Sequence, residues 1–167
     1  LMPSLVGSEM CIRDRRIAAL RPEGGHLVVR VDRTDPSKNI VRGFSAWALL
    51  LQEHPELHGK VTMFCQLDPS RQEVPEYARY FRRLMAEAGA INATWGSGSW
   101  QPLVLNTDPD FMAAVAAYCE YDVLFVNPVA DGMNLVSKEG PTVNERSGVV
   151  VLSEQAGSYR ELGEHVL

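Results

Sequence analysis

From Leu27 onward, short apolar runs rich in β-branched residues alternate with longer amphipathic stretches, and this alternation constrains the fold more than any other feature of the sequence. The apolar runs have the length of strands and are bounded by turn residues. The apolar residues of the longer stretches recur at helical spacing. A chain that alternates strands with helices forms a parallel sheet covered by helices. We therefore predict an α/β fold, a Rossmann-like parallel sheet with helices on both faces.

The individual elements follow from this alternation. Strands are expected at 27–31, 61–65, 102–105, 122–126 and 148–152. Helices are expected at about 40–54, 74–90 and 111–118, with another after the loop 127–136. The continuous apolar run 122–126 predicts a strand covered on both faces. Tyr77, Phe81 and Leu84 form an apolar stripe on the second helix, which we assign to the core.

Composition excludes several classes of protein. The chain has 167 residues, 46% of them hydrophobic, and a net charge of −5, which fits a single domain with a core and argues against nucleic acid or an anionic membrane as partner. No apolar run approaches the roughly 20 residues that cross a bilayer. Cys11, Cys65 and Cys119 have neither disulfide nor zinc spacing. We expect a protein of the reducing cytoplasm without a zinc site.

The two ends of the chain differ from its middle. Residues 1–14 have no amphipathic period and resemble a translated sequencing adapter, so we expect a non-native segment there. Residues 161–167 break off in what looks like the start of a helix. We therefore expect 15–167 to be a partial domain, truncated at both ends.

Charged residues follow the first two expected strands, at the sheet edge where parallel sheets bind ligands. Arg33 and Lys38 flank the entrance to a helix, so two cations and free backbone amides can face one diphosphate. Alternatively, Lys38 is solvated and Arg33 pairs with Asp35. Arg71 can hold a phosphate through two hydrogen bonds, or merely pair with Glu73.

The segment 131–139 is more informative. Gly132 permits a close backbone approach where a helix begins. Asp131 can accept hydrogen bonds from the hydroxyls of a sugar, and Glu139, about two turns on, can bind a ribose diol. Alternatively, Asp131 is only a helix N-cap and Glu139 a surface residue that pairs near Lys138.

Missing motifs narrow the choice further. The sequence has no GxxxxGK[ST] loop and no GxGxxG after the first strand, so neither ATP hydrolysis nor ordinary NAD binding is supported. It also has no GxSxG motif, which leaves serine hydrolase chemistry without support.

Several of these segments, taken together and in order, resemble the retaining glucosyltransferases of glycosyltransferase family 20, which include trehalose-6-phosphate synthase and glucosylglycerol-phosphate synthase. The resemblance runs from about Val29 to Leu162. Its anchors are RTDPSKN at 33–39, DPSR at 68–71, YDV at 121–123, DGMNLV at 131–136 with KE at 138–139, and LSE at 152–154 with AG at 156–157. The segment 131–139 is the most specific of them.

The resemblance implies a GT-B fold, in which two Rossmann-like domains face each other across the active site, with this chain as part of the carboxyl-terminal, donor-binding half. It implies that Arg33 and Lys38 bind the donor diphosphate and that Asp131 binds the transferred glucose. It further implies that Glu139 binds the ribose and Arg71 the acceptor's phosphate. Backbone contacts to the donor would come from Gly132, Met133, Asn134, Leu135 and Val136.

The implied reaction transfers glucose from a nucleoside-diphosphate-glucose, UDP-glucose first, to glucose-6-phosphate with retention at the anomeric carbon. The same resemblance admits a glucosylglycerol-phosphate synthase that uses ADP-glucose and glycerol-3-phosphate, or a non-catalytic sugar-nucleotide-binding relative. It leaves open whether the full-length protein is a homo-oligomer. The fragment alone is expected to bind donor weakly and not to turn over.

Overall fold

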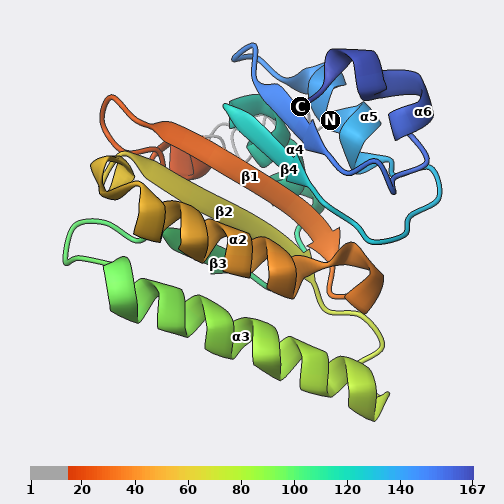
Figure 1. Ribbon diagram of the computed structural model, residues 1–167, viewed down its shortest axis with the longest axis horizontal. Helices are drawn as coiled ribbons and strands as arrows, with labels where there is room; N and C mark the ends of the chain where they lie inside the picture. The colour runs from red at the N-terminus through yellow and green to blue at the C-terminus, as the bar shows by residue number, and fades with distance from the viewer. Residues whose placement is uncertain (1–14) are drawn as a thin grey trace, which may run out of the picture.

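The computed structural model describes residues 15–167, and at its centre lies a five-stranded parallel sheet (Figure 1). The segment 1–14, expected to be non-native, lies outside the described residues. The strands are β1 (His26–Arg33), β2 (Val61–Asp68), β3 (Leu103–Asn106), β4 (Val123–Val126) and β5 (Val149–Leu152).

The strand order is β3-β2-β1-β4-β5. The chain therefore moves outward from β1 to β3, then crosses back to place β4 on the other side of β1. This creates a topological switch point between β1 and β4, the place where ligands bind in open parallel sheets. The predicted fold class is confirmed.

Helices cover both faces of this sheet (Figure 1). The longer helices are α2 (Ile40–Glu53), α3 (Pro75–Trp95), α4 (Phe111–Glu120) and α5 (Val136–Val143), followed by the short α6 (Tyr159–Leu162). The chain also has three single turns of 3-10 helix: η1 (Pro36–Lys38), η2 (Pro55–Leu57) and η3 (Gly163–His165). In the described residues 15–167, no helix is long and apolar enough to span a membrane.

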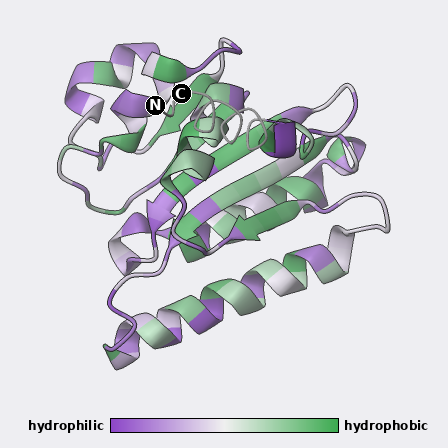
Figure 2. Ribbon diagram, turned by 180° about the vertical axis from the view of Figure 1, so that it is seen from behind, coloured by the Kyte–Doolittle hydropathy of each residue, from purple (hydrophilic) through white to green (hydrophobic). Residues whose placement is uncertain are grey.

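Two apolar clusters lie on opposite faces of the sheet, because side chains along a strand alternate between its faces. Leu27 and Val29 of β1 pack with α4, β4 and β5. Met63 of β2 packs with Phe44 of α2 and Leu84 of α3. Figure 2 shows the resulting hydrophobic strands between more polar helices.

Two predicted elements, a strand and a helix, need correction. Strand β2 runs three residues beyond its predicted end at Cys65, because the polar residues that follow continue the pairing with β1, Gln66 opposite Val31 and Asp68 opposite Arg33.

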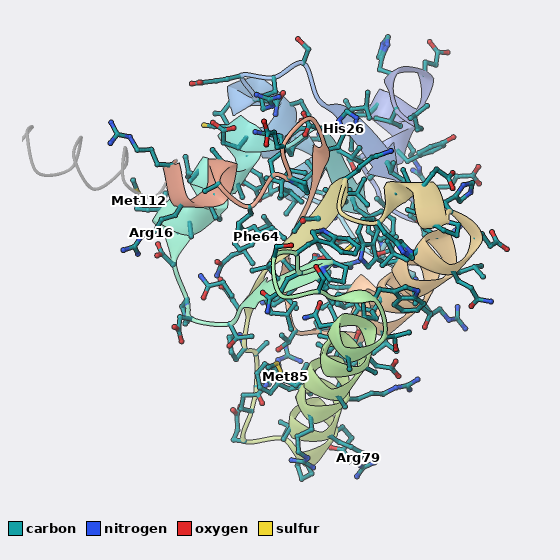
Figure 3. The ribbon with its side chains drawn as sticks, turned by 90° about the vertical axis from the view of Figure 1, so that its left-hand side faces the viewer. Arg16, His26, Phe64, Arg79, Met85 and Met112 are labelled. Carbon is teal, nitrogen blue, oxygen red and sulfur yellow. The ribbon has the colours of Figure 1, made fainter. Side chains whose placement is uncertain are left out.

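Helix α3 also departs from the prediction, both in length and in its buried face. It extends to Trp95 instead of ending near residue 90. Its buried residues are Leu84, Ala88 and Ile91, whereas Tyr77 and Phe81 are only half-buried. The first turns of α3 extend away from the sheet (Figure 1), and the Tyr77 hydroxyl instead contacts Asp35 and Arg71 of two loops. Figure 3 likewise shows Arg79 and Met85 on α3 well away from Phe64 in the sheet.

Asp122 joins three parts of the chain at the start of β1 and β4. Its Oδ2 accepts hydrogen bonds from the backbone amide of Leu27 at 2.7 Å and from Nε of Arg21 at 2.9 Å. Its Oδ1 accepts from Nε of Arg146 at 3.1 Å. Burial by itself would raise the pKa of Asp122, but these hydrogen bonds hold it below its ordinary value.

Substituting Asp122→Asn is expected to lower the free energy of unfolding at pH 7 by about 2 kcal/mol, the range for hydrogen bonds to a charged group. Because the folded-state pKa is depressed, this contribution is present above the unfolded-state pKa and is lost as the pH falls through the folded-state value. Urea unfolding at pH 7 and near pH 3 should therefore show a difference between wild type and variant that shrinks in acid. Asp108→Asn, at an exposed carboxylate, serves as the control; an equal loss at both pH values would contradict the assignment.

Candidate functional site

A pocket of about 450 Å³ lies at the carboxyl end of β1, beside the loop that follows β4. It is thus at the switch point of the sheet. Its lining residues are Val31, Asp32, Arg33, Lys38, Asp68, Asp131, Met133, Asn134, Leu135 and Val136. A larger cavity of about 1000 Å³, lined partly by Trp95 and Trp100, contains none of the predicted site residues. Charged residues that follow β1 and β4 therefore meet at the smaller pocket.

Lys38 and Asp131 meet directly in this pocket. The Lys38 Nζ lies 2.6 Å from Oδ2 of Asp131, and the two side chains are only 14% and 18% exposed. Lys38 is the last residue of η1, which is held at its start by Asp35, whose carboxylate accepts from the amide of Ser37 at 2.9 Å. The left-handed Asn39 (φ 60°) ends η1 and donates through Nδ2 to the carbonyl of Asn127. The alternative of a solvated Lys38 is wrong.

Asp131 is held by the loop that leads into α5. Asn134, buried and left-handed (φ 50°), donates through Nδ2 to Asp131 Oδ2 at 2.7 Å. Its Oδ1 accepts from the amide of Ser137 at 3.0 Å, so Asn134 satisfies an amide of the first turn of α5. The alternative that Asp131 is the N-cap is therefore wrong.

The electrostatics of the loop favour an ionised Asp131. Burial alone would raise the pKa of Asp131, but the hydrogen bonds from Lys38 and Asn134 and the positive charge of Lys38 hold it below its ordinary value. Asp131 is thus a carboxylate at neutral pH, an acceptor of hydrogen bonds only.

Arg33 lies at the rim of the pocket. It ends β1, is exposed, and lines the pocket. Within residues 15–167 it forms no ion pair with Asp35, whose carboxylate instead accepts from the Ser37 amide and from the Tyr77 hydroxyl at 3.1 Å. The guanidinium of Arg33 is therefore available to an anion in the pocket.

Three other predicted residues, Gly132, Glu139 and Arg71, lie outside the pocket lining. Glu139 is exposed on the first turn of α5. Arg71, left-handed at φ 49°, donates through Nη1 to the Tyr77 hydroxyl at 3.1 Å and stacks over that ring at 5.5 Å. Its partner is thus Tyr77 and not Glu73. The roles of Glu139 and Arg71 stay predictions.

The backbones of two loops approach each other closely where Gly157 contacts the carbonyl of Gly132, and the residue that must lack a side chain there is Gly157. A Cβ on Gly157 would lie 1.9 Å from the carbonyl oxygen of Gly132, whereas a Cβ on Gly132 would meet no described atom within 4 Å. The two loops are also joined through Asp131, whose amide donates to Gln155 and whose carbonyl accepts from the Gly157 amide. The fold itself therefore requires glycine at 157 but not at 132.

Gly157→Ala is expected to lower the free energy of unfolding by about 1 to 3 kcal/mol, because the new methyl group forces the two loops apart. Gly132→Ala is expected to change it by less than about 1 kcal/mol and is the matched control. Urea unfolding of both variants checks this. Equal stability of the two variants would show that the contact between the loops is not required.

The sequence interpretation missed a buried ion pair at the pocket, one partner of which, Asp32, is a lining residue. Arg30 Nη2 lies 2.8 Å from Asp32 Oδ2, and the two side chains are 1% and 5% exposed. Burial raises the pKa of Asp32 above its ordinary value, although Arg30 and Lys38 act in the opposite direction. The available signal was an arginine inside an apolar strand with an aspartate two residues later, hence on the same face.

The comparisons with known proteins bear on this geometry. The family model of glycosyltransferase family 20 matches residues 9–167. The chain belongs to glycosyltransferase family 20. An alpha,alpha-trehalose-phosphate synthase [UDP-forming] of Aspergillus fumigatus is 38% identical over 151 residues, which are 88% of this chain and 32% of that protein.

Solved structures of family 20 proteins agree with the fold. A trehalose-6-phosphate synthase structure from E. coli, described as bound with UDP-2-fluoro glucose, has a TM-score of 0.83 at 31% identity over 93% of this chain and 37% of its own. A Burkholderia xenovorans synthase in complex with glucose-6-phosphate has a TM-score of 0.83 at 31% identity, over 89% of this chain and 33% of its own. The chain thus spans about a third of the length of these relatives, and the predicted GT-B relationship is confirmed for the part it covers.

Proposed function

We propose that this chain forms the donor-binding part of a retaining glucosyltransferase that transfers glucose from UDP-glucose to glucose-6-phosphate and makes trehalose-6-phosphate. The observation that carries the proposal is the contact between Lys38 and Asp131, a cation and a carboxylate brought together from loops 93 residues apart at the switch point of the sheet. The relative named as a UDP-forming synthase, and the two structures described with a UDP-glucose analogue and with glucose-6-phosphate, support the choice of substrates.

The cations would act on the leaving group. As the bond from glucose to the diphosphate breaks, negative charge grows on the diphosphate oxygens and positive charge on the sugar ring. Lys38 and Arg33 line one pocket and would stabilise the departing diphosphate in that transition state. Helix α5 begins at Val136, on the same pocket, so the positive end of its dipole would add to this stabilisation.

Asp131 would hold the transferred glucose. Because it is an ionised carboxylate, it can accept hydrogen bonds from the sugar hydroxyls, which would replace the Lys38 ammonium as its partners. Lys38 would then turn from Asp131 to the diphosphate. Backbone groups of 132–136 would complete the donor contacts, and Gly132 has space around its Cα for a close approach.

The remaining assignments complete the proposal. Glu139 would bind the ribose, and Arg71, held by Tyr77, would reach the acceptor's phosphate. The leaving-group charge would be met by protein cations, so we propose that no metal or other cofactor is needed. Activity should then survive a chelator, and its loss in EDTA would contradict this part. A soluble nucleotide sugar and sugar phosphate fit a cytoplasmic reaction.

Two measurements test the proposed function. Isotope-edited NMR of this chain during titration with UDP-glucose should shift the backbone signals of 131–136, whereas NAD should leave them unchanged. Product analysis of a complete synthase that carries this chain should then give trehalose-6-phosphate with glucose-6-phosphate and little product with glycerol-3-phosphate. Preference for glycerol-3-phosphate, or no response to UDP-glucose in either measurement, would overturn the proposal.

A further inference from the structure

The buried pair of Arg30 and Asp32 has no part in the proposed chemistry, yet Asp32 lines the pocket and Arg30 donates to the carbonyl oxygen of Lys38. We propose that this pair is a positioning device that holds Lys38 where its ammonium can exchange between Asp131 and the donor's diphosphate. The inference rests on the proposed function, because it assigns a purpose to residues that would act only through Lys38.

Arg30 connects the segments that form the pocket. Its Nη2 donates to the carbonyl oxygen of Lys38 as well as to Asp32, and its Nη1 donates to Oδ1 of Asn127 at the end of β4. One guanidinium thus fixes β1, η1 and the loop after β4 relative to one another. Because its fork of donors is planar and rigid, these three acceptors can move little.

The residues around Arg30 hold its guanidinium in this position and shield it from water. Arg30 is fully buried, with its guanidinium 5.6 Å from the ring centre of Phe125. Gly43 of α2 makes the room, since a Cβ there would lie 2.6 Å from Arg30 Nη1. The charge of Arg30 is therefore held at a single place, next to the backbone of the residue proposed to bind the diphosphate.

Asp32 acts on the ammonium itself. Its Oδ1 lies 4.0 Å from Lys38 Nζ, and the Asp32 side chain is only 5% exposed. Lys38 thus lies between two carboxylates, Asp131 in contact and Asp32 slightly farther. The Arg30 guanidinium, 2.8 Å away, favours the ionised form of Asp32. When sugar hydroxyls occupy Asp131, this carboxylate would still attract the ammonium and keep it at the pocket, within reach of the diphosphate.

Stability does not account for the pair. A buried ion pair can be replaced by apolar residues of similar volume with little or no loss of stability, because desolvation offsets the attraction. Arg30 Nε also has no hydrogen-bond partner among the described residues, which adds a further cost. Placing Lys38 is the contribution that an apolar replacement would not supply.

The test removes both charges at once, so that neither is left unpaired. In a complete synthase that carries this chain, Arg30→Met with Asp32→Leu should lower kcat/KM for UDP-glucose by about 10- to 100-fold, the range for a misplaced catalytic group. The KM for glucose-6-phosphate should be unchanged, and urea unfolding should show a folded protein. Full activity in the folded double variant would overturn the inference.

A double-mutant cycle separates positioning from a general structural effect. If the pair acts through Lys38, adding the same two substitutions to Lys38→Ala should lower kcat/KM by less than about twofold further. A further loss as large as in wild type would overturn the inference. If the double variant does not fold, Asp32→Asn replaces it in the same cycle, and its effect on kcat/KM is again compared between wild type and Lys38→Ala. If Lys38→Ala itself has no effect, the proposed function fails, and the inference with it.

Discussion

Replacing Lys38 by alanine is expected to lower kcat/KM for UDP-glucose by about 10²- to 10³-fold in a complete synthase that carries this chain, the usual loss when one preorganised charge is removed. Most of the loss should fall on kcat, because charge on the diphosphate is greatest in the transition state. Initial rates of UDP release at varied UDP-glucose check this. The fold should survive, since Asp131 keeps its hydrogen bond from Asn134.

Lys60→Ala is the matched control. Lys60 is exposed and lies immediately before β2, at the end of the sheet opposite the pocket. Its substitution should leave kcat and KM unchanged. Activity of Lys38→Ala equal to that of Lys60→Ala would remove Lys38 from the site and would contradict the assignment of the pocket as the donor site.

Arg30→Met alone is expected to lower the free energy of unfolding by about 3 to 5 kcal/mol, the cost of leaving one partner of a buried ion pair unpaired. Asp32 would lose its guanidinium at 2.8 Å, and the carbonyl of Lys38 and Oδ1 of Asn127 would lose their donor. Urea unfolding at pH 7 measures the loss. Adding Asp32→Leu should recover most of it, because the uncompensated charge is then gone.

Arg42→Met provides a control of the same chemistry. Arg42 is exposed on α2, on the helix that also provides Gly43. Its substitution should change the free energy of unfolding by less than about 0.5 kcal/mol. A loss at Arg30 no larger than that at Arg42 would show that the buried charge is not held as the structure describes.

Much of the fold could be predicted because it depends on local pattern. Strands β1, β4 and β5 and helices α2 and α4 begin and end within two residues of their predicted bounds, since apolar period and turn residues lie next to each other in the sequence. The convergence of Lys38 and Asp131 could also be predicted, because the carboxyl ends of parallel strands share one edge.

What could not be predicted depends on distant segments. Arg30 is buried only because Gly43 leaves space and Asn127 supplies an acceptor, and these residues belong to other elements. Tyr77 looks like part of an apolar stripe, but its hydroxyl lies between Arg71 and Asp35, which spacing along one helix cannot indicate. The tight contact at Gly157 likewise depends on a carbonyl that belongs to another loop.

The adjacency of β1 and β4 also sets the order in which this molecule can be assembled. Val28 pairs with Val123, so the two walls of the pocket join only after β4 has been synthesised. Contacts between such distant residues slow folding, because a long loop must close before they form. A nascent chain that ends before β4 carries Lys38 without the carboxylate of Asp131, so the pocket cannot form until β4 and the loop after it have been added.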